Sequence, residues 1–431
     1  MSMLKVAIVG SGPAGCYVAE RLGRKAKGAV EIDVFDRLPT PFGLVRAGVA
    51  PDHQTTKAAA RVMAKAMEKP EVRFFGNVEI GRDLTLDALR AAYDAVVLAV
   101  GAPEDRGLDI PGADLPGVVG SGAFTRWIND HPDAADRGGD LAQARRAIVI
   151  GAGNVAIDAA RLLAKTAAEV EDSDLSPDVA SALQGAPLEE IAIVGRRGAA
   201  HLKFTPTELL ELGDLAEASL RIDPADAEQD PEATDNPQGY AALKELAGRP
   251  VEAKRLTLSL RFNLQPEECI AGADGRVASV RFRRTRSEGD RTVATNETVE
   301  LPADLVIACI GYRTRTPDGV AADGGRLANE EGRIAPGLYV VGWAKRGPSG
   351  TIGVNRAEAH AVADRLLDET PADDRPGRAA VAERLETAGA ESVDWSGWSR
   401  IDAAETARAE PGRVRRKFAD RGEMIAAARG A

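Results

Sequence analysis

The chain has 431 residues, of which 44% are hydrophobic and 28% are charged, and its formal net charge is −11. This balance is typical of a globular protein of two or three domains and argues against a disordered chain. The acidic charge excludes nucleic acid as the main partner, because phosphate binding needs a basic field. No segment approaches the roughly 18 apolar residues of a membrane-spanning helix.

The cysteine content and the start of the chain bear on its compartment. The three cysteines, Cys16, Cys269 and Cys309, lie far apart in the sequence. They form no CxxC pair, iron–sulfur ligand set or disulfide framework, so we expect no metal site. The first apolar run leads straight into glycines rather than a cleavage site, which predicts no signal peptide. A reducing cytoplasm is the expected location.

The first predicted unit covers residues 4–37, "LKVAIVGSGPAGCYVAERLGRKAKGAVEIDVFDR". An apolar strand leads into Gly10, Gly12 and Gly15, then an amphipathic helix, then a second strand that ends at Asp36. In the G-x-G-x-x-G pattern the first glycine permits a tight turn, the second admits a pyrophosphate, and the third allows close helix–strand packing. Asp36 stands where an acceptor for a ribose hydroxyl belongs. This context favours dinucleotide binding over a structural turn.

A comparable strand, glycine loop and helix begin at residues 145–165, "RRAIVIGAGNVAIDAARLLAK". A polar insertion (166–189) follows, and then the strand "IAIVGRR". The chain thus contains two similar units, which predicts the α/β class with two Rossmann-like dinucleotide-binding domains.

The second unit ends differently from the first. It supplies Gly151, Gly153 and, at the third position, Ala156, and its last strand ends in Arg196 and Arg197. A carboxylate there would repel the 2′-phosphate of NADP, whereas arginines bind it with charge-assisted bonds. We therefore expect NADPH in the second unit and a different dinucleotide, FAD, in the first. A degenerate duplicate with two ordinary surface arginines remains the alternative.

Several later segments complete this outline. Strands are predicted within residues 95–106 and 303–316, as later members of the two sheets. The Gly/Pro-rich stretch 109–122 is typical of a linker, and strand, glycine loop and helix are expected at 337–367. The Ala-rich, charged tail after about residue 368 predicts helices packed on the outside.

Four motifs together resemble the adrenodoxin-reductase-type ferredoxin–NADP reductases, a family that includes the mycobacterial FprA-like enzymes. They are "PTPFGLVRAGVAPDH" (39–53), "GAGNVAIDAAR" (151–161), "VGRRG" followed by "FTPTELLEL" (204–212), and "VGWAKRGPSGTIGVN" (341–355). The resemblance implies a FAD domain with an inserted NADP domain. It divides the chain into 1–107 (FAD domain, first part), 108–330 (NADP domain) and 331–431 (FAD domain, second part, with a C-terminal appendage).

The resemblance also implies nucleotide contacts. Those to the flavin nucleotide fall on Ala14, Asp36, Leu44, Val78, Trp343, Gly350, Thr351 and Ile352. Those to NADP fall on Arg106, Gly153, Asn154, Val155, Ala156, Arg196, Arg197, Glu208 and Gly350. Asp36 replaces the glutamate of many relatives and can still accept from the ribose.

Three further residues, His53, Glu211 and Trp343, each have two possible roles. The resemblance implies that His53 and Glu211 lie near the flavin and serve proton movement; otherwise His53 is a structural or exposed loop residue and Glu211 a solvated helix residue. Trp343 replaces an aspartate found in many paired-dinucleotide flavoproteins and implies an apolar surface beside the flavin. A core tryptophan at a domain seam is the other reading.

The expected activity is that of a ferredoxin–NADP(+) reductase: NADPH gives a hydride to FAD, and single electrons pass to an iron–sulfur protein. The missing cysteine ligands require that acceptor to be a separate ferredoxin. Ferredoxins of this kind are typically acidic, and Lys254, Arg255 and Arg261 are a candidate basic patch for one, or else a solvated charged face.

Other activities remain possible from the sequence. A disulfide reductase would need a redox-active cysteine pair, which is missing. A diaphorase or flavin monooxygenase would share both cofactors. An NADPH sensor or an electron-input subunit of a larger complex would bind the nucleotide without steady turnover.

Overall fold

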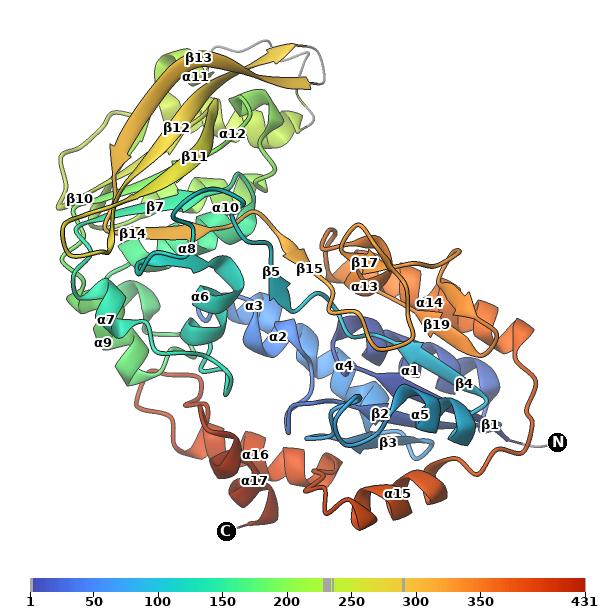
Figure 1. The fold of residues 1–431 in the computed structure, drawn as a ribbon. Helices are drawn as coiled ribbons and strands as arrows, with labels where there is room; N and C mark the ends of the chain where they lie inside the picture. Colours follow the sequence, from blue (N-terminus) through green and yellow to red (C-terminus); the bar gives the residue numbers. More distant parts are fainter. Residues whose placement is uncertain (1–2, 228–233, 235, 289–290, 431) are drawn as a thin grey trace. The chain divides into compact units, whose positions relative to one another are not determined.

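The computed structural model describes residues 3–227, 234, 236–288 and 291–430. The chain divides into two compact units. Unit 1 comprises Met1–Glu104, Asn129–Pro132 and Tyr312–Ala431, and unit 2 comprises Asp105–Ile128 and Asp133–Gly311. Figure 1 shows unit 1 formed by the blue and the orange-to-red ends of the chain, and unit 2 formed by the green and yellow middle.

The chain passes between the two units more than once. Unit 1 runs to Glu104, returns at Asn129–Pro132 and resumes at Tyr312. The domain boundaries that the resemblance implies, after residues 107 and 330, stay a prediction. Leu327 is fully buried in a core of unit 1, so the hairpin of β16 (Ala322–Asp323) and β17 (Arg326–Leu327) belongs there. The stretch 109–122 is part of unit 2 and not a linker, because its β6 (Val118–Gly120) pairs with the sheet of that unit.

Unit 1 contains a six-stranded sheet in the order β18-β19-β4-β1-β2-β3. Its strands are β1 (Leu4–Val9), β2 (Val30–Phe35), β3 (Val72–Phe75), β4 (Ala95–Leu98), β18 (Arg333–Ala335) and β19 (Leu338–Val340). All neighbours pair in parallel except β18, which runs antiparallel to β19. Two successive parallel strands need a crossover on a face of the sheet, so helices cover it.

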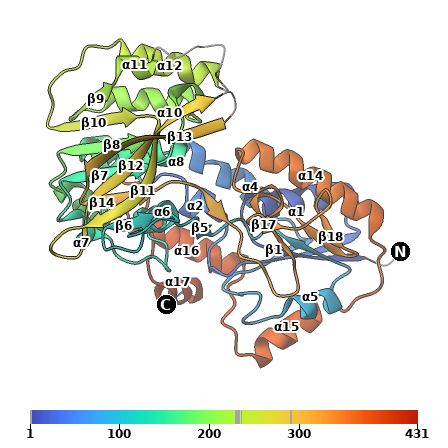
Figure 2. The same ribbon diagram turned by 45° about the horizontal axis from the view of Figure 1, so that its top comes forward.

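Alternation along β1 divides the interior of unit 1 into two cores. Val6 and Ile8 face the core that contains α1 (Pro13–Ala26) and α14 (Ile352–Glu369), whereas Ala7 and Val9 face the core with α5 (Leu86–Ala92) and α15 (Arg378–Thr387). Figure 2 shows these two helix pairs on opposite sides of the sheet. The near-continuous apolar sequence of β1 follows from burial on both faces.

The remaining helices of unit 1 are short or lie in the C-terminal tail. They are α2 (Leu44–Ala47), α3 (Gln54–Lys57), α4 (Ala59–Met67), α13 (Trp343–Arg346), α16 (Trp395–Ala407) and α17 (Arg421–Arg429). The tail was expected on the outside, but Trp398, Ile401 and Met424 are buried in the same core as α1. The tail is therefore part of the packing of unit 1.

Unit 2 also contains a six-stranded sheet, all parallel, in the order β6-β14-β7-β8-β10-β9. The strands besides β6 are β7 (Arg146–Ile150), β8 (Glu190–Val194), β9 (Ala218–Ile222), β10 (Leu256–Arg261) and β14 (Leu305–Ala308). The helices are α6 (Ser121–Ile128), α7 (Gly138–Leu141), α8 (Asn154–Ala164), α9 (Pro177–Gly185), α10 (Pro206–Glu211), α11 (Pro224–Ala227) and α12 (Pro237–Ala247).

A second, antiparallel sheet covers one face of the unit 2 sheet. It consists of β11 (Leu264–Ala271), β12 (Val277–Glu288) and β13 (Arg291–Pro302). Phe282 on β12 is fully buried in one core with Ile148 of β7 and Val194 of β8. This antiparallel layer replaces the helices expected on one face of a doubly wound domain.

The predicted fold class is confirmed, since each unit has a parallel sheet with the strand–glycine turn–helix–strand order of a Rossmann-like domain. The expected helix and strand at 337–367 are also present, as β19 and α14. The strand pairing places the predicted late strands β4 and β14 directly beside β1 and β7, the strands that lead into the two glycine turns.

We predict that Phe282→Ala destabilises unit 2 by about 3–5 kcal/mol, the usual cost of an aromatic cavity in a packed core. Arg284→Ala on the same strand is the control, because the exposed Arg284 pairs only at the surface with Glu297, at 3.5 Å. It should change the free energy of unfolding by less than about 1 kcal/mol. Urea unfolding of the full chain, followed by circular dichroism, measures both. Equal effects would contradict the packing of β12 on the parallel sheet.

Candidate nucleotide-binding sites

The turn after β1 requires glycine at its first and third positions. Gly10 has φ +108°, and a Cβ atom there would lie 2.4 Å from the carbonyl oxygen of Ala99. Its amide donates to the carbonyl of Phe35 at 2.7 Å, which ties the turn to the end of β2. A Cβ on Gly15 would lie 2.0 Å from the carbonyl oxygen of Gly10. Any side chain at either position would force the backbone apart.

The turn after β7 repeats this geometry. Gly151 has φ +151°, and a Cβ atom would lie 2.3 Å from the carbonyl oxygen of Cys309. Its amide donates to the carbonyl of Val194, the last residue of β8, at 2.9 Å. Ala156 takes the third position and is fully buried. The internal duplication therefore extends to individual backbone contacts.

The middle glycines differ, because nothing in the fold excludes a side chain from them. A Cβ on Gly12 would come no closer than 4.0 Å to Gly43, and one on Gly153 would have nothing within 4 Å. Both residues precede a helix N-terminus, of α1 and α8, and neither end is capped by a side chain. An open space before uncapped amides suits the pyrophosphate of a dinucleotide. Both turns thus fit such a ligand.

Asp36 follows β2 at the edge of the first turn. Its carboxylate accepts the amides of Ser11, at 2.9 Å, and Leu38, at 3.0 Å, and the hydroxyl of Ser11. Burial raises the pKa of this carboxyl, and the bonds from Ser11 and Leu38 oppose that shift. Asp36 is partly exposed, so its remaining lone pairs can accept from a ribose. Ser11, which holds the carboxylate, was not predicted as a site residue.

The loop of residues 39–53 packs against the first glycine turn. The amide of Phe42 donates to the carbonyl of Ser11 at 3.0 Å, and Phe42 adopts a φ of +79°, which is rare for a residue with a side chain. Gly43 has φ +48°, and a Cβ on it would lie 3.1 Å from the Cα of Gly12. Leu44 follows at the start of α2 and is 44% exposed. This places Leu44 beside the turn, with its side chain accessible.

The other predicted flavin contacts are distributed over unit 1. Ala14 lies in the first turn of α1, and the side chain of Val78 is buried in the core beneath the sheet. The ring of Trp343 stacks on Tyr312, with 5.9 Å between centroids and 15° between planes. Its Nε1 donates to the carbonyl of Ser349 at 3.1 Å.

The loop after Trp343 leads into α14. Gly350 has φ +82° and Thr351 is the residue before the helix, so Gly350, Thr351 and Ile352 form its entry. Arg346 orders this loop by donating to the carbonyl of Ser349 at 2.9 Å and to Asn355 at 2.9 Å. The predicted segment is thus a hydrogen-bonded turn at a helix N-terminus.

Arg196 and Arg197 lie directly after β8 and are held through their backbones. The hydroxyl of Thr285 donates to the carbonyl of Arg196 at 2.6 Å, and the amide of Asn263 donates to the carbonyl of Arg197 at 3.3 Å. The side chain of Arg196 is exposed and that of Arg197 half-buried. Thr285 of β12 and Asn263, which precedes β11, therefore fix the backbone of both arginines near the carboxyl end of the parallel sheet.

Glu211 is tied to the helix that follows the second glycine turn. It lies at the end of α10, 3.2 Å from Nε of Arg161 on α8, and Arg161 also pairs with Asp158 at 2.8 Å. Arg161 is fully buried. It was not predicted as a site residue, although it ends the motif "GAGNVAIDAAR". His53 belongs to unit 1 and precedes α3, so the two residues predicted to move protons come from different units.

Of the other predicted NADP contacts, Gly350 lies in unit 1 and the rest lie at two places in unit 2. Asn154 and Val155 begin α8, and the side-chain oxygen of Asn154 accepts the amide of Thr205 at 2.9 Å, just before α10. Glu208 lies in the first turn of α10 and is partly buried. Arg106 is exposed, and its amide donates to the carbonyl of Gly311 at 2.9 Å.

Asp105 is a structural residue that sequence reasoning missed. Its carboxylate accepts the amides of Gly122, at 2.6 Å, and Ala123, at 3.0 Å, at the start of α6. It thereby satisfies amides that a helix leaves without internal partners. Its sequence signal was weak, because it lies among the three charged residues that end the stretch 95–106, where only a strand was predicted.

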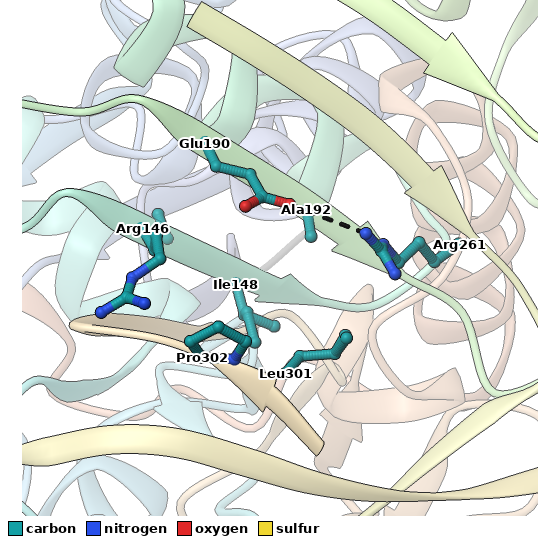
Figure 3. A pocket seen from close by; sticks show the side chains of 8 residues that line it. Arg146, Ile148, Glu190, Ala192, Arg261, Leu301 and Pro302 are labelled. Carbon is teal, nitrogen blue, oxygen red and sulfur yellow. Dashed lines mark ion pairs between the residues drawn. The ribbon is translucent and has the colours of Figure 1, made fainter. Parts of the chain in front are cut away.

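A separate cavity of about 160 Å³ lies on the covered face of the unit 2 sheet (Figure 3). Arg261 and Glu190 face each other across it at 3.6 Å, and Leu301 and Pro302 of β13 close it. It lies between the two sheets rather than at the glycine turn. Its size is below the 300–1,000 Å³ typical of small-molecule sites. We assign no nucleotide to it.

Among residues 3–227, 234, 236–288 and 291–430, no three or more His, Cys, Asp or Glu side chains gather as a metal site would require. Over the same residues, every helix is too short or too polar to span a bilayer.

Comparison with known proteins places these two units in a family. The model of the pyridine nucleotide-disulphide oxidoreductases matches residues 4–191. Human mitochondrial NADPH:adrenodoxin oxidoreductase is 37% identical over 98% of this chain and 91% of its own length. A probable ferredoxin/ferredoxin--NADP reductase of Mycobacterium tuberculosis is 37% identical over 99% of this chain and 76% of its own length. The chain belongs to the adrenodoxin-reductase-type ferredoxin–NADP reductase family.

A solved structure supports the membership in three dimensions. Mycobacterium tuberculosis FprA, determined in complex with NADPH, superposes with a TM-score of 0.94 at 36% identity, and the match covers 99% of this chain and all of that one. The resemblance that the four motifs indicated is confirmed.

The two classes of glycine predict opposite phenotypes. Gly153→Ala should leave the unfolding temperature within about 2 °C of the parent, since the new Cβ enters open space, but raise the Kd for NADPH at least about tenfold by blocking the pyrophosphate. Gly151→Ala should instead lower the unfolding temperature, because its Cβ meets a backbone carbonyl. Calorimetry and nucleotide titration separate the two effects. Unchanged NADPH affinity in Gly153→Ala would remove this turn from the site.

Proposed function

We propose that this chain is an NADPH-dependent FAD enzyme that accepts a hydride from NADPH and passes single electrons to a ferredoxin-type iron–sulfur protein. The main support is the pair of equivalent glycine turns. The strand beside the first turn is followed by a carboxylate, and the strand beside the second is followed by two arginines. The relatives named for reduction of adrenodoxin or ferredoxin support the choice of acceptor. Bound FAD would supply the step from two-electron to one-electron transfer.

We assign FAD to unit 1 and NADP(H) to unit 2. In unit 1 the amides at the start of α1 hold the pyrophosphate and Asp36 accepts from the ribose, with Ser11 orienting the carboxylate. In unit 2 the amides at the start of α8 have the same role, and Arg196 and Arg197 bind the 2′-phosphate. The remaining predicted contacts complete these two sites.

The roles of His53 and Glu211 in proton movement stay a proposal. Glu211 also has a structural task, since its ion pair with Arg161 joins α10 to α8. A substitution at Glu211 would therefore leave a guanidinium buried without part of its counter-charge. His53 offers the cleaner test, because its replacement leaves that ion pair intact.

Acceptor docking on Lys254, Arg255 and Arg261 likewise stays a proposal. Lys254 donates to the carbonyl of Leu215 at 2.7 Å and Arg255 to that of Leu188 at 3.1 Å, so both also bind within unit 2. A cytoplasmic location is proposed on the bacterial relatives, whereas the human relative is named mitochondrial.

An anaerobic titration tests the proposed activity. Adding NADPH to the purified protein should bleach a bound flavin spectrum, and adding an oxidised ferredoxin should restore it. Reoxidation by oxygen or a small molecule alone would instead support the diaphorase or monooxygenase, and bleaching without steady turnover would support a sensor. A protein that carries no flavin would contradict the assignment of unit 1.

The arginine pair predicts the choice of nucleotide. Replacing Arg196 and Arg197 by glutamine should raise the KM for NADPH by about a hundredfold or more, since each lost charged bond costs roughly 1.5–3 kcal/mol. The KM for NADH, which lacks the 2′-phosphate, should change little. Steady-state kinetics with both nucleotides measures the difference. Equal losses would show that the arginines do not read the phosphate.

A further inference from the structure

The C-terminal segment of residues 391–429 contacts the rest of unit 1 at the carboxyl ends of β2 and β3. Val393 and Gly76 exchange two backbone hydrogen bonds, at 2.8 and 2.9 Å. Arg421, at the start of α17, donates to the carbonyl of Arg37 at 2.7 Å and to Asn77 at 3.2 Å. Arg37 follows Asp36 directly. The segment therefore lies where the strands carry the predicted flavin-nucleotide contacts.

Glu405 on α16 is the centre of a buried charge network. Its side chain is fully buried, and it accepts from Arg46 at 2.6 Å, from Arg415 at 3.4 Å and from the amide of Phe418 at 3.0 Å. A buried carboxylate is tolerated only when its oxygens are neutralised and hydrogen-bonded, as they are here. Arg46 is the partner outside the tail, and it belongs to the 39–53 loop. The network thus fastens that loop to α16.

Two tryptophans of α16 hold the same loop at a second point. Trp395 and Trp398 both meet Phe42 edge-on, at 6.2 and 5.9 Å between centroids, and the guanidinium of Arg46 lies 5.2 Å from the centroid of Trp398. Phe42 is the residue with φ +79°, a conformation that costs free energy unless its surroundings enforce it. The aromatic contacts and the ion pair supply that enforcement.

The held loop is the one that touches the first glycine turn. Phe42 donates its amide to Ser11, whose amide and hydroxyl in turn bind Asp36. Gly43 lies against Gly12 at the open space before α1. A continuous chain of contacts therefore runs from Glu405 through the loop to the groups assigned to the pyrophosphate and the ribose.

We propose that the C-terminal segment is a clamp for the flavin site and that Glu405 is its positioning residue. By fixing Arg46, Glu405 keeps the loop of Phe42 and Gly43 seated on the Gly12 turn, so that the site is formed before FAD binds. Ordering the loop in advance removes its entropic cost from binding. The proposal rests on the assignment of FAD to unit 1.

Glu405→Gln tests the clamp, because glutamine keeps the volume but removes the charge that Arg46 and Arg415 share. Asp33→Asn is the matched control in the same unit. Asp33 is also fully buried, paired with Arg378 of α15 at 2.7 Å and with the hydroxyl of Tyr93 at 2.7 Å. It fastens a different part of the tail, on the other side of the sheet, and does not touch the loop.

Three measurements are made on flavin-free protein prepared from each variant. FAD titration by quenching of flavin fluorescence should show a Kd raised at least about tenfold in Glu405→Gln and less than about threefold in Asp33→Asn. Trypsin should cleave after Arg46 faster in Glu405→Gln than in the parent or the control. The Kd for NADP(+) should be unchanged in both variants.

Arg46→Gln supplies an independent test should Glu405→Gln fail to fold, since it leaves Glu405 bonded to Arg415 and Phe418. It should weaken FAD binding similarly, and the double variant should be no weaker than the worse single variant, because both substitutions break the same Arg46–Glu405 ion pair. An unchanged FAD affinity in Glu405→Gln, an equal loss in Asp33→Asn, or additive losses in the double variant would overturn the clamp. Failure of the parent flavin-free protein to bind FAD would instead overturn the assignment of FAD to unit 1.

Discussion

The close approach of a glycine turn to the neighbouring strand is the constraint on which both halves of this protein depend. At Gly10 and Gly151 the backbone passes a carbonyl oxygen so closely that a single added carbon would lie 2.4 or 2.3 Å from it. The contact brings the ends of β1, β2 and β4 together in unit 1, and the ends of β7, β8 and β14 together in unit 2. The helix N-terminus then borders an open space, to which we assign a dinucleotide in the proposed function.

The two proposed sites have similar backbone geometry but differ in charge. A carboxylate follows β2 in unit 1, held by two amides and a hydroxyl, whereas two arginines follow β8 in unit 2, held through their carbonyls. A carboxylate accepts a hydrogen bond from a ribose hydroxyl and repels a phosphate. A guanidinium attracts a phosphate and cannot accept a hydrogen bond from the hydroxyl. In the proposed assignment, the same fold therefore distinguishes the two cofactors by the sign of a few charges at equivalent positions.

The parts of the fold that were predicted well have a local signal. Glycine spacing after an apolar strand indicates both turns. The arginine pair is recognisable because it stands at a strand end where a carboxylate is expected. The stretch 109–122 was taken for a linker because it is rich in Gly and Pro, but its β6 pairs with β14, a contact that the local sequence does not indicate. The tail was expected on the outside because its sequence is Ala-rich and charged. Its few large apolar residues, such as Trp398 and Ile401, form no clear pattern, yet they are buried in the core.

The sequence by itself determined the two Rossmann-like units and the positions of both glycine turns, because each depends on neighbours within one strand–turn–helix segment. For the same reason it predicted the residues that we propose to distinguish a ribose from a 2′-phosphate. Only the tertiary structure decided what supports these sites. Glu405 lies 359 residues from Arg46 along the chain, and the Thr285 that fixes Arg196 lies 89 residues away. Contacts between such distant residues have no periodicity or spacing to reveal them, since they arise from packing, which brings together segments whose local sequences are independent.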